Sequence, residues 1–273
     1  MKRSSWLKLT APIIGLACIV LAFRVDSPDE GLFVYCGAGI RPAMKSLCED
    51  FTKQTGVRVQ TAYAGSGCLL SMLAFAKTGD LYMPGEQEYV DQGKKKGYIT
   101  DDATVGYFVA VVIVQKGNPK GIRTLADLAR SDIKVGIGNP DSVACGLVAK
   151  KILQKAGVWE KVYENIEARG TCTATAMELS NAVVLNALDA VINWDAMAYP
   201  VRDKVDILTI PRGQNVDVAI PLATLSWSKR QAEAARFTEF ALSAAGRKHF
   251  AAHGYHTTLT PYALPYYGEN TLD

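Results

Sequence analysis

The sequence lacks the short motifs by which many enzymes are identified. Its 273 residues contain no C-x-x-C pair, which excludes a zinc ribbon and a thioredoxin-type redox site. A Walker loop and a G-x-G-x-x-G fingerprint are also missing, so the chain carries neither of these nucleotide-binding signatures. Ser66 lies between two glycines but lacks the spacing of a nucleophile elbow. The sequence therefore offers no candidate catalytic residues, and we expect no cofactor.

Histidine is scarce as well. The three histidines, His249, His253 and His256, lie close together near the C-terminus. They are far in sequence from every glycine-rich turn described below. We therefore interpret them as part of a solvated helix end and not as catalytic or metal-binding residues.

The chain has little net charge. The formal value is +3, and no stripe of lysine and arginine interleaved with aromatic residues occurs, which excludes a nucleic-acid partner. We interpret the short basic run at residues 94–96 as the solvated end of a helix. With 49% hydrophobic and 21% charged residues, the composition is that of a folded protein with a packed core.

The first residues have the pattern of an export signal. Lys2 and Arg3 precede roughly 15 apolar residues between Trp6 and Phe23, fewer than the roughly 20 of a membrane-spanning helix. We expect residues 1–26 to be a signal peptide, with a weak lipoprotein-like site at Cys18, or an N-terminal membrane anchor. Either role predicts a periplasmic or membrane-associated extracytoplasmic protein.

Cysteine is the residue type whose role the sequence leaves open. Disulfides are permitted outside the cytoplasm. Five cysteines follow Cys18, so at least one of them stays free or pairs elsewhere, and their spacing does not fix a connectivity. They are Cys36, Cys48, Cys68, Cys145 and Cys172.

One construction recurs along the chain. An apolar run from Leu32 ends in a turn of small residues at 37–39, and Pro42 then opens an amphipathic helix. A helix start of this kind presents free backbone N–H groups and the positive end of the helix dipole, which together suit an anion. The turns at 64–67 and 139–146 repeat the arrangement after further predicted strands. Three copies favour a binding cleft over ordinary connections between strands and helices.

Predicted strands alternate with predicted helices over the rest of the chain, which indicates an α/β fold with parallel strands. A continuous apolar run at 108–114 is typical of a strand buried on both faces. Further strands are predicted at 57–63, 80–83, 134–138, 165–169, 189–194, 205–210 and 216–225, and helices at 86–96, 147–156, 176–188 and 229–249.

We predict two Rossmann-like lobes joined by two crossing strands, one at 108–114 and one within 205–225. Residues 30–110 with 215–273 form the first predicted lobe, and residues 111–214 form the second. Ligands bind beyond the carboxyl ends of parallel strands, so the turns at 37–39, 64–67, 139–145 and 170–180 should face the cleft between the lobes. Their backbone N–H groups and hydroxyls suit a tetrahedral oxyanion.

Between about residues 32 and 256 the chain resembles the periplasmic molybdate-binding proteins, which are solute receptors of ABC importers. The resemblance rests on residues 34–40 with 43–44, 64–69, 79–83, 138–146 with 149–150, 157–159 and 190–196, taken in this order. The most specific segment among them is Gly138–Val143. It implies a type II periplasmic binding protein fold whose two α/β lobes close over the anion.

The resemblance also implies ligand positions. Ser66 matches the serine of the second turn, whereas Gly39 stands where the family has a serine and Trp194 where it has a tyrosine. Cys145 occupies the position of a backbone donor in the third turn, and a fourth contact falls between Thr171 and Ser180. The candidate ligand-binding residues are Ala38, Gly39, Ser66, Gly67, Cys68, Ser142, Cys145, Ser180 and Trp194.

Four cysteines fall beside the four predicted cleft turns: Cys36, Cys68, Cys145 and Cys172. Small buried thiols filling tight turns would account for this placement. A site for a thiophilic metal or metalloid, bound through thiolates, is the alternative.

We therefore expect an exported, monomeric solute-binding protein that takes a tetrahedral oxyanion, molybdate or tungstate first, and delivers it to an ABC transporter permease. Its contact with a membrane would be through the N-terminal segment or the permease. The alternatives are another ligand, such as a sulfate-like anion, a phosphonate or a thiophilic ion, and a receptor that feeds a sensor kinase. A hydrolase or redox enzyme that uses Ser66 or a cleft cysteine is disfavoured, because no histidine is placed to act with it.

Overall fold

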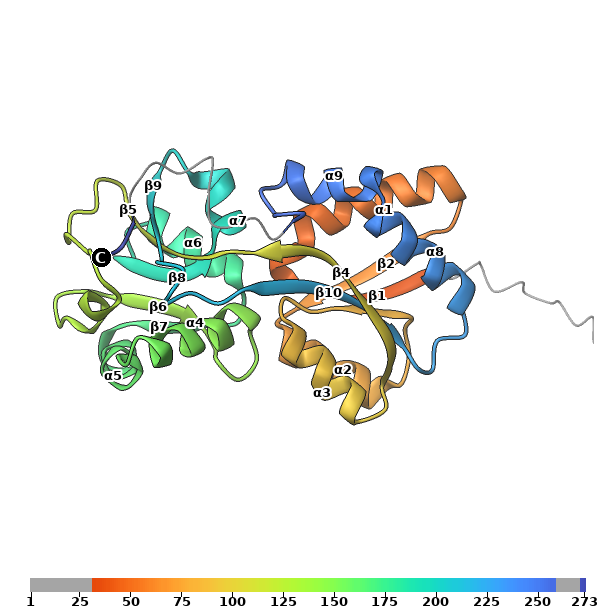
Figure 1. Ribbon diagram of the computed structural model, residues 1–273, viewed down its shortest axis with the longest axis horizontal. Coiled ribbons are helices and arrows are strands. Elements are labelled where there is room, and N and C mark those ends of the chain that lie inside the picture. Colours follow the sequence, from red (N-terminus) through yellow and green to blue (C-terminus); the bar gives the residue numbers. More distant parts are fainter. Residues whose placement is uncertain (1–30, 259–270) are drawn as a thin grey trace, which may run out of the picture. The chain divides into compact units, whose positions relative to one another are not determined.

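Two five-stranded sheets form the framework of the protein (Figure 1). The computed structural model describes residues 31–258 and 271–273, so the segment predicted as a signal peptide or anchor lies outside the described residues. In the described part of the chain no helix is both long and apolar enough to cross a membrane.

The first sheet has the strand order β2-β1-β3-β10-β4. The strands β1 (Leu32–Gly37), β2 (Val59–Ala64) and β3 (Leu81–Met83) are parallel, as the alternation with helices predicts. The strands β10 (Val218–Leu225) and β4 (Ile99–Phe108) are antiparallel to each other, and β10 also runs antiparallel to β3. The sheet thus brings together two distant parts of the chain.

The second sheet has the order β7-β6-β8-β5-β9. Its strands β6 (Val135–Gly138), β7 (Thr171–Thr173) and β8 (Ala190–Trp194) are parallel. The strand β5 (Ala110–Gln115) pairs antiparallel with both β8 and β9 (Val205–Thr209). The residues from Val111 to Val114 of β5 are fully buried, as their continuous apolar run predicts.

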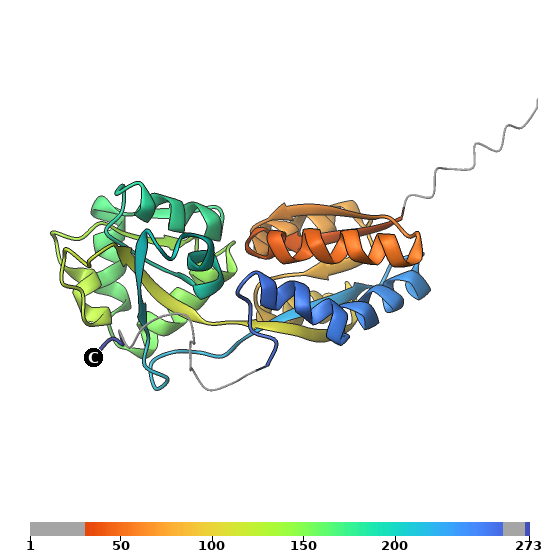
Figure 2. The ribbon, with the colours of Figure 1, turned by 90° about the horizontal axis from the view of Figure 1, so that it is seen from above.

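Helices cover both faces of each sheet, because each sheet has two apolar faces to bury. Figure 1 shows α1, α8 and α9 on one face of the first sheet and α2 and α3 on the other, and Figure 2 shows α1 alongside α8 and α9. The helices are α1 (Arg41–Thr55), α2 (Ser66–Ala76), α3 (Gln87–Lys95), α4 (Ala144–Lys155), α5 (Trp159–Arg169), α6 (Ala176–Val184), α7 (Asp195–Ala198), α8 (Gln231–Leu242) and α9 (Ala244–Ala252), with short 3₁₀ turns at Ala38–Ile40 (η1), Leu125–Ala129 (η2) and Tyr199–Val201 (η3).

Three sequence predictions of local structure were wrong. Residues 165–169 belong to α5 and not to a strand, because the buried Asn165 side chain donates to the carbonyls of Leu128 and Ile133 from a helical face shared with Val162. The apolar run at 108–114 is not one strand, since it is interrupted between β4 and β5. The terminal helix is two helices, because Ser243 leaves the helical conformation and caps α9 through the N–H of Gly246.

The sheets divide the chain as follows. The first contains strands from 32–108 and 218–225, and the second contains strands from 110–209. The last described residues lie against the second sheet, where the Leu272 N–H donates to the Thr209 carbonyl at 2.9 Å. The division into two lobes that move relative to each other stays a prediction.

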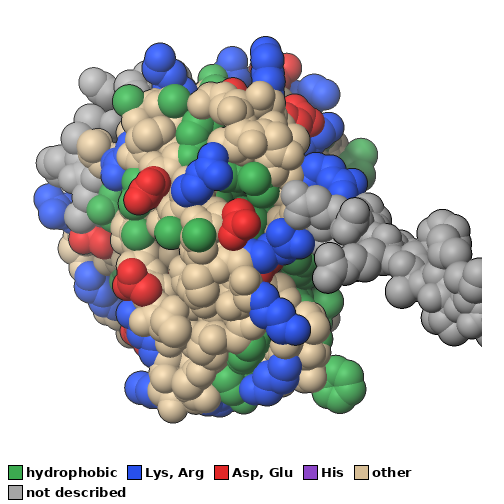
Figure 3. Space-filling model, turned by 90° about the vertical axis from the view of Figure 1, so that its right-hand side faces the viewer, with side chains coloured by type: hydrophobic (Ala, Val, Ile, Leu, Met, Phe, Trp, Pro, Cys, Tyr) green, Lys and Arg blue, Asp and Glu red, His purple; other side chains and the backbone are tan. Residues whose placement is uncertain are grey.

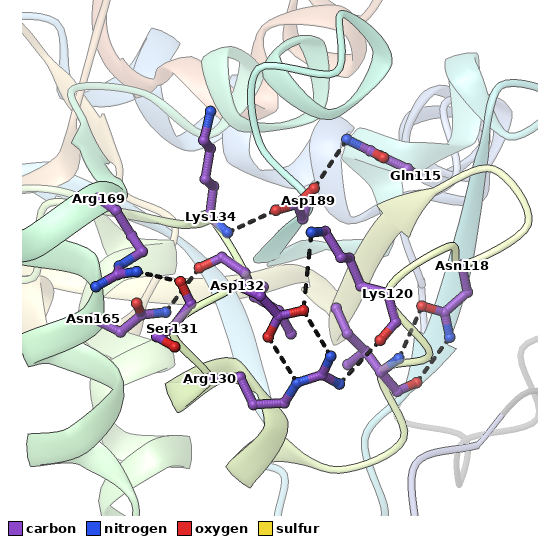
Figure 4. A network of polar contacts seen from close by, with 12 residues as sticks. Gln115, Asn118, Lys120, Arg130, Ser131, Asp132, Lys134, Asn165, Arg169 and Asp189 are labelled. Carbon is purple, nitrogen blue, oxygen red and sulfur yellow. Dashed lines mark hydrogen bonds and ion pairs between the residues drawn. The ribbon is translucent and has the colours of Figure 1, made fainter.

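Polar contacts fix the turns around the second sheet (Figure 4). The Arg130 guanidinium donates to both carboxylate oxygens of Asp132, at 3.1 and 2.9 Å, and to the Lys120 carbonyl at 3.0 Å. The Asp189 carboxylate accepts the N–H of Lys134 at 2.8 Å and the amide of Gln115 at 3.3 Å. Arg130 pairs with Asp132, and Asp189 accepts from a backbone N–H and a neutral amide, so these contacts indicate a structural role.

The surface shows no continuous basic stripe on the face drawn in Figure 3. Lysine and arginine side chains are scattered there among acidic, polar and apolar ones. This distribution agrees with the low net charge of +3.

Candidate functional site

Four turns that follow parallel strands converge on one cavity. The turns after β1 and β2 come from the first sheet, and those after β6 and β7 come from the second. The cavity has a volume of about 20 Å³. On the same scale one water molecule needs roughly 10–15 Å³, so the cavity is little larger than a water molecule. It is lined by Gly37, Ala38, Gly39, Ile40, Ala64, Gly65, Ser66, Gly85, Phe108, Val143, Ala144, Cys145, Thr175, Ala176 and Trp194.

Each of these turns leads into the start of a helix. The helices η1, α2, α4 and α6 begin at Ala38, Ser66, Ala144 and Ala176, and all four of these residues line the cavity. In none of the four does a side chain of the described residues cap the first turn, whereas in α3 the Glu86 carboxylate does so. Uncapped first turns leave backbone N–H groups available to a ligand.

Ser66 supplies a hydroxyl whose direction of donation is fixed. It is buried at the first position of α2, and its Oγ accepts the backbone N–H of Gly85 at 3.0 Å. The Tyr82 hydroxyl donates to the Ser66 carbonyl at 2.7 Å and anchors the residue from the other side. Because the Oγ already accepts a hydrogen bond, its own proton remains for donation.

An aromatic pair forms one wall of the cavity. The rings of Phe108 and Trp194 stack with centroids 4.5 Å apart and an interplanar angle of 10°. Trp194 is 2% exposed and ends β8, whereas Phe108 ends β4 in the other sheet. The stack therefore joins the two sheets beside the cavity.

None of the described residues that line the cavity carries a charged side chain. The Cys145 thiol also stays neutral at ordinary pH, because burial raises its pKa to about 12. The site thus consists of dipoles, hydroxyls and apolar surface, which suits an anion that is stabilised by hydrogen-bond donors and not by a counter-charge.

The nine predicted site residues fall into two groups. Ala38, Gly39, Ser66, Cys145 and Trp194 line the cavity. The other four, Gly67, Cys68, Ser142 and Ser180, do not line it, for the reasons that follow.

Two of the four join the turns to each other. The N–H of Gly67 donates to the carbonyl of Ser142 at 2.9 Å, so this pair holds α2 against the turn that precedes α4. Cys68 is exposed on the outer side of α2. Ser180 is buried on α6, where its Oγ accepts from the side chain of Asn193 at 3.1 Å.

The cysteines are not assembled into a common site. All five in the described part of the chain are free, with Cys36, Cys48 and Cys145 buried and Cys68 and Cys172 exposed. Burial raises the pKa of Cys36 and Cys48 as well as that of Cys145, so these three are thiols and not thiolates at neutral pH. Among the residues described, no group of three or more cysteine, histidine or acidic side chains could hold a metal ion.

Sequence reasoning missed several cavity residues. Thr175 and Val143 belong to predicted turns, and Val143 ends the most specific segment of the family resemblance, but neither was predicted to bind the ligand. Gly85 and Phe108 follow or end strands of the first sheet, so the rule that sites lie at the carboxyl ends of parallel strands could have identified Gly85 alone. Phe108 comes from the antiparallel β4, which the sequence analysis did not predict.

The interpretation of the histidines as a solvated helix end was wrong for His249 and His256, whose rings pair with carboxylates. The His256 ring, with its side chain 20% exposed, contacts the Asp195 carboxylate at 2.6 Å. The His249 ring contacts Asp50 on α1 at 3.0 Å. These contacts join segments that are distant in sequence, and sequence spacing gives no sign of them.

The chain is similar in sequence to bacterial binding proteins. A family profile described as bacterial extracellular solute-binding protein matches residues 32–256. A binding protein of Haemophilus influenzae is 29% identical and covers 87% of this chain and 94% of its own length. The molybdate-binding protein ModA of Mycobacterium tuberculosis is 27% identical, covering 88% of this chain and 91% of its own.

Solved structures share the fold. The periplasmic molybdate-binding protein of Azotobacter vinelandii superposes with a TM-score of 0.71 at 16% identity, over 84% of this chain and all of that one. The matched family and these neighbours are substrate-binding proteins and not enzymes.

Proposed function

The chain belongs to the family of bacterial extracellular solute-binding proteins, and we propose that it captures a tetrahedral oxyanion for the permease of an ABC importer. Molybdate or tungstate is the proposed ligand. The observation that carries the proposal is the neutral cavity at which four uncapped helix starts meet. The relative from M. tuberculosis, named as molybdate-binding, supports the choice of anion.

The free energy of anion binding would come from several helix starts acting together. Each contributes about 0.3–1 kcal/mol to binding a negative charge at an exposed site, and up to about 2 kcal/mol in a partly buried one. Four such contributions, together with the Ser66 hydroxyl, offset part of the cost of removing a dianion from water. The ligand-binding residues that we propose are those of the cavity: the backbone around Ala38 and Gly39, Ser66, Cys145 through its backbone, and Trp194 through its indole N–H.

The same cavity favours an anion without protons. A hydrogen phosphate ion needs an acceptor for its own O–H group, and an unpaired donor in a buried site costs about 1–3 kcal/mol. The described lining residues include no carboxylate that could accept this proton. We therefore expect fully deprotonated dianions to bind in preference to phosphate.

Capture would proceed by closure of the two predicted lobes, residues 30–110 with 215–273 and residues 111–214. Ligand in the cavity would contact turns from both sheets, so it would favour the closed arrangement over the open one. The cavity of about 20 Å³ is small, which implies that the turns separate to admit an anion and adjust around it. We propose that the protein acts as an exported monomer.

Calorimetric titration of the purified protein with molybdate, tungstate, sulfate and phosphate tests the proposal, with and without reductant. Tight binding of molybdate or tungstate in both conditions is expected, with phosphate weakest. Binding of none of these anions would overturn the proposal. Binding of a thiophilic ion to the reduced protein alone would assign the ligand to the cysteines instead.

A further inference from the structure

His256 and Asp195 form a nearly buried pair directly behind the aromatic wall. The distance from Nε2 to Oδ2 is 2.6 Å, and the exposed fractions of the side chains are 20% for His256 and 2% for Asp195. Asp195 is the residue after Trp194, whose ring lines the cavity. Any shift of Asp195 therefore acts directly on a cavity residue.

Asp195 also holds the point at which the chain crosses from one sheet to the other. Its N–H donates to the Val109 carbonyl at 2.9 Å, and its Oδ1 accepts the N–H groups of Ala196 at 2.8 Å and Val109 at 3.4 Å. Val109 lies between β4 and β5 and follows Phe108, the ring that stacks on Trp194. The carboxylate thus fixes the backbone next to both aromatic residues.

The segment that carries His256 reaches the cavity at a second point. Tyr255 donates its hydroxyl proton to the Gly39 carbonyl at 2.5 Å, and its ring packs on Phe108 with centroids 5.4 Å apart. His256 exchanges two backbone hydrogen bonds with Tyr107, at 2.7 and 3.2 Å. These contacts attach residues 255–256 to the end of β4 and to the first cavity turn.

We propose that Tyr255 and His256 are positioning residues for the ligand cavity, and that the charge on the His256–Asp195 pair controls ligand affinity. The inference rests on the proposed function only in that its first readout is the binding of an oxyanion. Tyr255 sets the position of the Gly39 turn. His256, through Asp195, sets the position of the Trp194 ring against Phe108.

Because His256 and Asp195 both titrate, the position of the Trp194 ring should depend on pH. The hydrogen bond to Asp195 raises the pKa of His256, whereas burial raises the pKa of the Asp195 carboxyl. The ion pair therefore exists between these two raised values, and on the alkaline side it is lost when the imidazole releases its proton.

Other titratable groups lie near the pair. Tyr255 is part of the same segment, and its own pKa is raised by burial and by the nearby Cys36 and Asp195. Arg247 of α9 donates to the Thr257 carbonyl at 2.6 Å. The raised pKa values of Tyr255 and Cys36 keep both groups neutral at the pH at which the imidazole titrates, so the alkaline transition belongs to His256.

The test measures molybdate affinity by calorimetry from about pH 6 to about pH 9, a range that begins below the ordinary histidine pKa of about 6.5 and extends well above it. We expect the dissociation constant of the unaltered protein to rise about fivefold with pH, the size of effect that one hydrogen bond carries. The double variant Asp195→Asn/His256→Gln keeps an amide hydrogen bond but has no titrating group, so its affinity should not change with pH.

His249→Gln is the matched control, because His249 pairs with Asp50 on α1 and does not line the cavity. It should retain the pH profile of the unaltered protein. The inference would be overturned if the affinity of the unaltered protein did not change with pH. It would also be overturned if the double variant still lost affinity as the pH rises.

A second readout does not require a ligand. In a background with Trp6, Trp159 and Trp227 replaced by Phe, the remaining tryptophan fluorescence comes from Trp194. Its emission should follow one transition in this pH range in the unliganded protein, and the double variant should abolish that transition. If no anion binds at any pH, the proposed function fails, and this titration alone supports or overturns the positioning role.

Discussion

The Ser66 hydroxyl and the Gly85 N–H, which lie 19 positions apart in the sequence, form a hydrogen bond of 3.0 Å at the edge of the cavity. The Gly85 N–H orients the Ser66 Oγ so that its own proton is free to donate. One short loop after β3 therefore determines the chemistry of a residue on α2.

Ser66→Ala should weaken molybdate binding by about tenfold or more, because it removes a hydrogen-bond donor to a charged ligand, a loss of about 1.5–3 kcal/mol. Calorimetric titration measures the change. Ser71→Ala is the control, since Ser71 is exposed on the same helix and donates to the Gly67 carbonyl. Equal affinities for both variants and the unaltered protein would show that Ser66 does not contact the anion.

Trp194→Phe should retain the stack on Phe108 but lose the indole N–H. We expect about a tenfold loss of affinity, the value of one hydrogen bond to a charged group, with a smaller effect on the melting temperature. Trp159→Phe is the matched control, because Trp159 stacks on Tyr163 at 4.7 Å and does not line the cavity. If both variants lose affinity equally, the indole of Trp194 has no special role.

Gly65→Ala should oppose closure. A Cβ at Gly65 would lie 2.6 Å from the Ser142 carbonyl oxygen, so α2 and the turn before α4 could no longer approach as they do. Overpacking of this kind costs about 1–3 kcal/mol, which predicts a loss of affinity of about tenfold. Gly213→Ala, where an added Cβ meets nothing within 4 Å, should have no effect on binding. Unchanged affinity in Gly65→Ala would argue against close approach of the two turns in the liganded state.

The cysteines should behave as packing residues. In the folded protein, iodoacetamide should label the exposed Cys68 and Cys172 and leave Cys36, Cys48 and Cys145 unmodified until the chain unfolds. Mass spectrometry of the labelled peptides checks this order. Cys145→Ser should alter molybdate affinity little, since the proposed contact there is a backbone N–H. Loss of binding in Cys145→Ser, without loss of folding, would point to a thiol ligand.

Stability should also depend on His256. Because the pKa of His256 is raised in the folded state, its contribution is fully present below the unfolded value of about 6.5 and is lost as pH rises through the raised value. The difference in unfolding free energy between the unaltered protein and His256→Gln should therefore shrink with rising pH. Urea titrations at several pH values measure it, and a difference that is constant with pH would contradict this assignment.

Much of the fold could be predicted from local pattern. The alternation of strands and helices predicted the three parallel strands of each sheet, and the small residues after β1, β2 and β6 predicted helix starts that face a common cavity. These features depend on neighbours in the chain, so the sequence displays them directly. The helical face of Asn165 was missed because its two partners, the carbonyls of Leu128 and Ile133, lie 37 and 32 positions away.

Residue order by itself predicted the α/β architecture, the small uncharged residues of the turns and five of the residues that line the cavity. The tertiary structure alone decided which side of each turn faces the cavity, and so turned Gly67, Cys68, Ser142 and Ser180 away from it. It also brought Tyr255 to Gly39 across 216 positions and His256 to Asp195 across 61. Contacts of this range arise when sheets and helices pack, because burial selects which polar groups must meet, and no local pattern in the chain encodes that choice.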